Sequence, residues 1–170
     1  ANFGCSCGDP SDPCDFLDPQ DLADLGLPSF VENVAVIEDS APPQLQEFSI
    51  SPTVVDTTMG PATVTFTARV TDDLSGIYAI DGGAFDDIYV NYCDSNAGGC
   101  YGVSVECFLP ANRIGGDTTD GTYQCSFEVP QGVLGLFHVG VGLRDIVGNI
   151  DLLLDADLVA LGFPGVFLSG

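Results

Sequence analysis

The chain has 170 residues, of which 45% are hydrophobic and only 16% are charged, enough apolar surface for one domain with a core plus an extension. Its 25 acidic residues stand against three arginines and no lysine, and the formal net charge of −22 excludes binding to a nucleic-acid backbone. The lack of lysine also excludes a P-loop, a Schiff base and a lysine–asparagine crosslink. No apolar run is long enough to predict insertion into a membrane.

Two segments precede the expected domain. Residues 1–20 are rich in Cys, Pro, Gly and Asp and lack hydrophobic periodicity, which predicts an extended, Cys-containing coil. Residues 21–43 continue with one helical turn at 21–26, a strand-like run from Phe30, and a linker that contains adjacent prolines. The domain itself is expected to span residues 44–170.

The domain is predicted to consist of short strands separated by turns. The clearest strand lies within residues 62–72, where one face is polar and carries threonines and Arg69. The apolar residues of the other face are Val64, Phe66, Ala68 and Val70. Further apolar runs follow, with Gly, Asp, Asn and Pro between them, and no long helix is indicated. This pattern predicts an all-β fold, an antiparallel β-sandwich.

The seven cysteines favour disulfide bonds over a metal site, because their spacing matches no zinc or haem pattern and the chain has a single histidine. The expected pairs are Cys93 with Cys100 across a Gly-rich loop, and Cys107 with Cys125 between two strands. The pairing of the remaining cysteines, Cys5, Cys7 and Cys14, stays open. Because the total is odd, one thiol is either free or bonded to another chain. A disulfide framework predicts an oxidising, extracellular location.

Four stretches of the domain resemble Ig-like modules of prokaryotic secreted and cell-surface proteins. They are TVTFTARVTDDLSGI, DGTYQCSFEVP, GLFHVGVGLRDIVGN and DLVALGFPGVF, which correspond in such modules to strand B with its turn, strand E, strand F with its turn, and the final strand. The resemblance covers about residues 40–170; residues 81–115 depart from the pattern, and residues 1–20 have no counterpart. It implies an Ig-like β-sandwich of the kind found in tandem-repeat adhesins or fibres.

Two similar phrases occur in the chain, DLADLGLPSFVE from Asp21 and DLVALGFPGVFL from Asp157. In tandem Ig-like modules a closing strand is followed by a short proline linker and the next module, which is the order of residues 21–50. An extended strand without its own sheet has unpaired backbone groups, so we expect it to be donated to a neighbouring subunit in a homopolymer. Alternatively, it folds back on its own domain or belongs to a longer array. The expected contact residues are Phe30, Val31, Val34, Val36 and Ile37.

Acidic and amide side chains from three segments predict a Ca²⁺ site. In an Ig-like sandwich the B–C and F–G turns lie at the same end, and the linker enters near that end. Calcium takes six to eight oxygen ligands in flexible geometry. The expected ligands are Asp39 from the linker, Asp72 and Asp73 from the first turn, and Asp145, Asn149 and Asp151 from the second. Alternatively, these side chains only form Asx-turns, with Gly76 and Gly148 at positive φ.

No catalytic site is expected, because His138 lies in an alternating strand and its pattern favours a surface position over a general base. The Gly clusters precede no helix and do not predict phosphate binding. The sequence therefore predicts a non-enzymatic extracellular structural protein, a subunit or repeat of a self-assembling surface filament or adhesin. The alternatives are a Ca²⁺-dependent module that binds carbohydrate or another surface through residues 81–100, and an ancillary domain of a secreted hydrolase.

Overall fold

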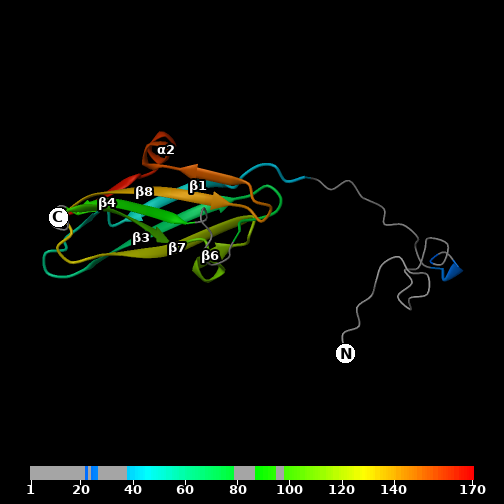
Figure 1. Ribbon diagram of the computed structural model, residues 1–170, viewed down its shortest axis with the longest axis horizontal. Helices are drawn as coiled ribbons and strands as arrows, with labels where there is room; N and C mark the ends of the chain where they lie inside the picture. The colour runs from blue at the N-terminus through cyan, green and yellow to red at the C-terminus, as the bar shows by residue number, and fades with distance from the viewer. Residues whose placement is uncertain (1–21, 23, 27–37, 79–86, 95–97) are drawn as a thin grey trace, which may run out of the picture. The chain divides into compact units, whose positions relative to one another are not determined.

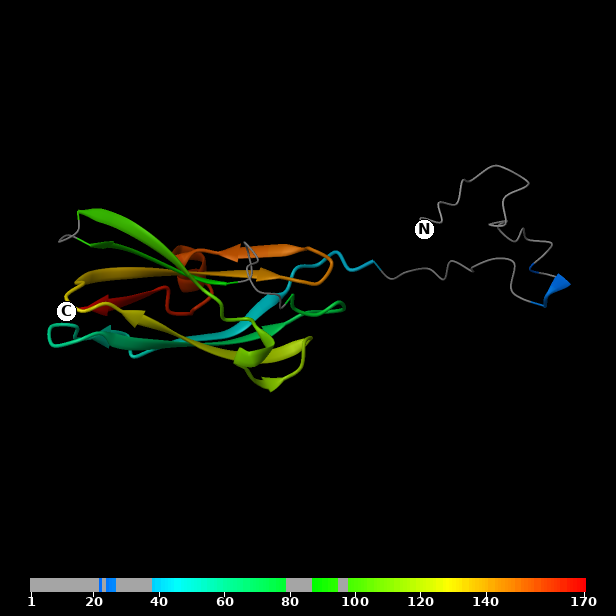
Figure 2. The ribbon, with the colours of Figure 1, turned by 60° about the horizontal axis from the view of Figure 1, so that its bottom comes forward.

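The computed structural model describes residues 22, 24–26, 38–78, 87–94 and 98–170. The chain divides into two compact units, Ala1–Glu38 and Asp39–Gly170. The linker residues 39–43, which the sequence analysis places before the domain, belong to the second unit. That unit consists of two packed sheets (Figures 1 and 2).

The first sheet has four strands in the order β1-β3-β7-β6 and is antiparallel throughout. Its strands are β1 (Gln44–Ser51), β3 (Ala62–Thr71), β6 (Arg113–Gly116) and β7 (Asp120–Val129). The second sheet has six strands; five follow the order β2-β10-β8-β4-β5, and β9 also pairs with β8. Its strands are β2 (Val54–Val55), β4 (Ile88–Asp94), β5 (Gly99–Val105), β8 (Gly135–Arg144), β9 (Ile150–Leu153) and β10 (Val166–Ser169). Only β2 and β10 run parallel.

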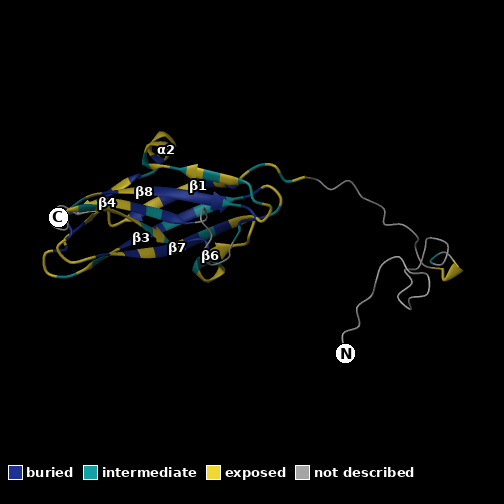
Figure 3. Cartoon of the chain, viewed as in Figure 1, coloured by how far each residue is buried: buried dark blue, intermediate teal, exposed yellow. Residues whose placement is uncertain are grey.

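The core lies between the two sheets, and Figure 3 shows the buried residues along their strands. Strand β3 buries the apolar face that its alternation predicts: Val64, Phe66, Ala68 and Val70 are all fully buried. Aromatic rings link the layers, because Phe167 of the second sheet lies 6.3 Å from Phe66 of the first and stacks on Phe137 at 4.6 Å. The predicted all-β sandwich is thus confirmed.

The outer faces of the two sheets differ. On the first sheet, threonines and other polar groups bond across strands, as in the 3.4 Å contact between the hydroxyls of Thr65 and Ser126. On the second sheet, Val54, Leu136 and Leu168 occupy one cross-strand row and are each exposed by 45% or more. Apolar surface is therefore concentrated on the outside of the second sheet.

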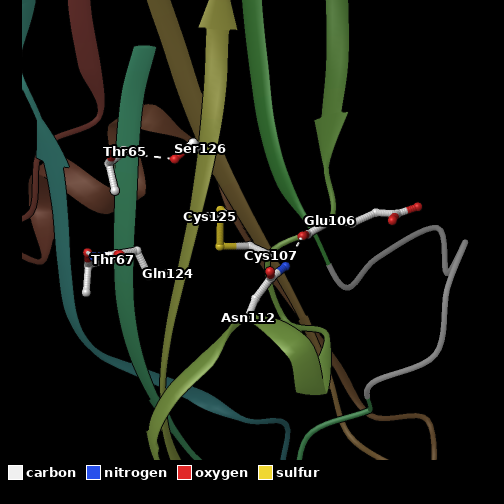
Figure 4. The surroundings of a disulfide bond; sticks show 8 residues. All are labelled: Thr65, Thr67, Glu106, Cys107, Asn112, Gln124, Cys125 and Ser126. Carbon is white, nitrogen blue, oxygen red and sulfur yellow. Dashed lines mark hydrogen bonds between the residues drawn. A yellow bond between two sulfur atoms is a disulfide. The ribbon is translucent and has the colours of Figure 1, made fainter.

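Both predicted disulfides are confirmed. Cys107, which follows β5, is bonded to Cys125 of β7, and this pair lies inside the sandwich (Figure 4). Cys93 and Cys100 face each other directly across β4 and β5, with a Cα–Cα distance of 3.9 Å, and both are exposed. Such bonds are typical of proteins from oxidising compartments. The other expected disulfide cysteines, Cys5, Cys7 and Cys14, lie outside the described residues.

The second copy of the repeated phrase is a helix followed by a strand, where the sequence analysis expects a closing strand alone. Helix α2 (Asp155–Ala160) buries only Leu158, and Gly162 ends it at φ +88°. The N–H groups of Gly162 and Phe163 donate to the carbonyls of Val159 and Leu158, which is a Schellman turn. Strand β10 begins only at Val166. A short 3₁₀ helix, η1 (Pro110–Asn112), precedes β6.

The described residues of the first copy repeat the start of this pattern. Leu22 and Asp24 are helical, as the predicted turn at 21–26 requires, and Gly26 has φ +69°. Gly26 holds the place in the first copy that Gly162 holds in the second. The two copies therefore share a helix end at the same position of the phrase.

Candidate metal centre

Three segments of the second unit bring a carboxylate to one place. Asp39 belongs to the linker, Asp72 follows β3, and Asp145 follows β8; one oxygen from each lies within 4.8 Å of the others. The linker enters the sandwich at the end where the turn after β8 lies (Figure 1). Asp72 and Asp145 are buried, and Asp39 is partly buried. We call these three residues the acidic cluster.

The turn after β3 fixes Asp72. Its Oδ1 accepts hydrogen bonds from the N–H groups of Leu74 at 3.1 Å and Gly76 at 2.6 Å, which is an Asx-turn. Gly76 has φ +87°, and a Cβ there would lie 3.1 Å from the side chain of Thr118. A glycine is therefore needed at this point of the turn.

The turn after β8 fixes Asp145 in a similar way. Its Oδ1 accepts from the N–H groups of Gly148 and Asn149, at 2.6 and 2.7 Å. The Asn149 side-chain amide donates to Oδ2 of Asp145 at 2.6 Å and to the backbone carbonyl of Asp39 at 3.2 Å. Asn149 thus connects the turn to the linker.

Asx-turns do not account for the whole cluster, because two carboxylate oxygens remain without a partner. Oδ1 of Asp39 and Oδ2 of Asp72 are buried and accept no hydrogen bond, and Asp72 is only 8% exposed. Among the described residues, the arginine ion pairs join Arg69 to Glu47 and Asp120, and no member of the cluster takes part in them. Buried charges in proteins are normally paired or bound to a metal. Hard oxygen donors from three segments fit Ca²⁺ or Mg²⁺.

Ser75 favours the ionised form of Asp39. It lowers the pKa of Asp39 against the opposing effect of burial, and its backbone N–H donates a hydrogen bond to Oδ2 of Asp39 at 2.9 Å. Ser75 is a residue that the sequence analysis did not single out. Its position three residues after Asp72, within the same turn, is the signal that could have indicated it.

The other predicted ligands lie apart from the cluster. Asp73 is exposed, although it is adjacent to Asp72, and a pocket of about 280 Å³ borders both residues. Asp151 lies on β9, where it pairs with Leu143. The structure therefore brings together Asp39, Asp72 and Asp145, with Asn149 bonded to two of them. Of the loop predicted to bind carbohydrate, residues 81–86 and 95–97 lie outside the described residues.

His138 occupies the outer surface of the second sheet, as its place in the strand pattern predicts. Its Nδ1 lies 2.7 Å from Oδ2 of Asp155, and this contact is the leading cause of the lowered pKa of Asp155. The pair borders a groove of about 300 Å³, which Tyr89, Leu152 and Leu154 also line. The histidine thus forms a surface hydrogen bond with Asp155 beside apolar side chains.

Comparison with protein-family models, with characterised proteins and with solved structures finds no match for this chain. Within the part of the chain that the structure describes, no helix has the length and apolar character needed to cross a membrane.

Proposed function

We propose that this chain is a non-enzymatic extracellular structural module with an Ig-like fold, and that it serves as a subunit or repeat of a self-assembling surface filament. The strand order supports the Ig-like assignment: β1-β3-β7-β6 corresponds to A-B-E-D, and the order β10-β8-β4 in the second sheet corresponds to G-F-C. The bond between Cys107 and Cys125 departs from that pattern, since antibody domains join strands B and F.

The acidic cluster carries the proposal. It joins Asp39, from the chain that leads into the sandwich, to two turns of the sandwich itself. A divalent cation bound there would hold the linker in one direction as it leaves the domain. A fixed exit direction is what a repeating filament needs at each junction. Asp39, Asp72 and Asp145 would supply carboxylate oxygens, and Asn149 would keep the linker close to them.

The repeated phrase supports assembly through the N-terminal segment. The sandwich already has its closing element, α2 and β10, in place against β8. The copy at residues 21–32 is therefore additional to what this fold uses. Donated to another subunit, it would make a heterologous contact, which propagates into a filament. The proposed contact residues, Phe30, Val31, Val34, Val36 and Ile37, lie outside the described residues.

Electron microscopy of the full chain tests this function. We expect filaments in excess Ca²⁺ and fewer or shorter ones in chelator, with light scattering as a second measure of size. Removal of residues 1–38 should leave a folded monomer, because the hydrophobic core described begins at Leu45. Single particles in every condition would contradict the filament. An identical melting curve with Ca²⁺ and with chelator would contradict the cation site alone.

A further inference from the structure

Sheet edges decide where a donated strand can bind. In the described part of the chain, five strands have a side that no other strand pairs: β1, β2, β5, β6 and β9. Strands β2, β6 and β9 offer only two to four residues each. Strand β1 is longer, but it carries Glu47 and an irregular register beside it. Short, charged or bulged edges resist pairing with another chain.

Strand β5 has none of these protections. Its seven residues, GCYGVSV, include no charge and no proline, and its pairing with β4 has no irregularity. An exposed, regular and uncharged edge is a template for the addition of a further strand. Among the edges of this sandwich, β5 is therefore the best acceptor.

The backbone of β5 shows which groups are available. Antiparallel pairs alternate between wide, hydrogen-bonded pairs and narrow pairs that exchange no hydrogen bonds. Cys93 and Cys100 form a narrow pair, with Cα atoms 3.9 Å apart. By alternation, the N–H and C=O groups of Cys100, Gly102 and Ser104 point away from β4, toward the open edge.

The side chains of β5 offer apolar surface to an added strand. On the inner face, Val103 and Val105 are partly buried against the core, and Tyr101 stacks on Tyr92 at 5.6 Å while remaining 44% exposed. On the outer face, Gly102 has no side chain, so a hollow of about 470 Å³ extends from the edge to Leu136 and His138. An added strand would bury apolar atoms on both faces.

We propose that β5 is the acceptor edge for residues 30–37 of a second copy, which add to it as a strand. This inference rests on the proposed filament function and names the surface that joins the subunits. The segment, FVENVAVI, is eight residues long, rich in β-branched residues, and carries one charge, Glu32. Two copies of a chain with net charge −22 repel each other. A contact between a nearly uncharged strand and an uncharged edge avoids placing carboxylates opposite one another.

A matched pair of full-chain variants tests the acceptor edge. Gly102→Ala and Gly102→Pro both add a Cβ, whose nearest neighbour would be the mobile end of Asn91, at 2.8 Å from Oδ1. Only proline removes the N–H that points to the open edge, and edge strands tolerate proline. We expect Gly102→Ala to form filaments like the native chain, and Gly102→Pro to reduce the polymerised fraction about ten-fold, as the loss of roughly 1.4 kcal/mol of contact energy would. Melting curves of both variants should show an intact sandwich.

Hydrogen exchange and a donor variant complete the test. In filaments of the native chain, the amides of Cys100, Gly102 and Ser104 should become protected, whereas the outward amides of β1 should not. Prolines at both Val34 and Ala35 should block assembly, and the control Val34→Ala should not, because one of two adjacent N–H groups in a strand faces the paired strand and only proline removes it.

The outcomes separate this inference from the function on which it rests. If native filaments form without protection at β5, or if Gly102→Pro polymerises as well as Gly102→Ala, the acceptor assignment is overturned and the filament function stands. If β5 is protected while the variant with prolines at both Val34 and Ala35 still assembles, two copies pair through β5 itself, and the donor assignment is overturned. If the native chain forms no filament, both proposals fail.

Discussion

Replacement of Asp72 by Asn should have opposite effects with and without a divalent cation. The Asn Oδ1 can still accept from the N–H groups of Leu74 and Gly76, because those bonds use only one carboxylate oxygen. Its Nδ2 takes the place of Oδ2, the oxygen that is buried without a partner, and can donate to a neighbouring carboxylate. The variant thus removes one of three close negative charges while keeping the turn.

The separation of the carboxylates sets the size of the effect. Two unit charges 4.8 Å apart interact by about 3.5 kcal/mol at an effective dielectric constant of roughly 20. Asp72 has two such neighbours, but Asp39 is only partly buried, so solvent screens part of the repulsion. We expect the Asn variant in chelator to be about 1–3 kcal/mol more stable than the native chain. The native chain should gain about 2.7 kcal/mol at a Ca²⁺ concentration 100-fold above its Kd, and the variant much less.

Urea denaturation in chelator and in excess Ca²⁺ measures both effects, and urea is preferable to guanidinium because it does not screen charges. Asp73→Asn is the matched control: it removes the same charge from the neighbouring, exposed residue and should leave the Ca²⁺ response unchanged. Lower stability of Asp72→Asn in chelator would refute the repulsion argument. A Ca²⁺ response equal to that of the native chain would refute Asp72 as a ligand.

Three further predictions concern the stability of the sandwich. Replacing Cys107 and Cys125 together by Ala opens a loop with a sequence separation of 18, and should lower the free energy of unfolding by about 3 kcal/mol. Thermal melting measures this loss, and reductant should cause no further loss through this bond. An unchanged melting temperature in the double variant would contradict the stabilising role of the disulfide. Leu158→Ala should lower the free energy of unfolding by about 2–5 kcal/mol in urea denaturation, because Leu158 is fully buried. Val159→Ala, on the exposed side of the same helix, should lower it by less than about 0.5 kcal/mol. Equal losses would contradict the role of Leu158 in holding α2 against the sandwich. The bidentate bonds from Arg69 lower the pKa of Asp120, so this group stabilises the fold above its unfolded pKa of 3.8, and its contribution is lost as the pH falls through the lowered value. The difference in melting temperature between the native chain and Asp120→Asn should therefore shrink below pH 3.8, and a constant difference would contradict the coupling.

The strands of the sandwich could be predicted because each sheet buries one face. In β3 the alternation from Val64 to Val70 determines which residues point inward, whatever lies around them. The closing phrase could not be read in this way. Whether DLVALG is a helix or a strand depends on the place that the fold offers to Leu158, and that place is formed by distant residues.

The acidic cluster was predictable as a meeting of three segments, because the topology of a sandwich brings its turns to one end. All three members were among the six expected ligands, but which of the six would meet was not predictable, since the direction of each side chain depends on the local turn. Asp72 bonds back to its own turn and points inward, which leaves the adjacent Asp73 exposed. The two unpartnered oxygens depend on atomic positions that no residue pattern specifies.

The interruption of the closing strand has a consequence for local unfolding. One side of β8 is paired by β10 up to His138 and by β9 from Val141, while the chain between them leaves the sheet as α2. The two pieces can therefore separate from β8 independently of each other. Strand β9 has no fully buried residue, whereas β10 carries Phe167, which is buried between the layers and stacks on Phe137. Local loss of β9 would thus leave the core covered, whereas β10 should open only when the sandwich unfolds as a whole.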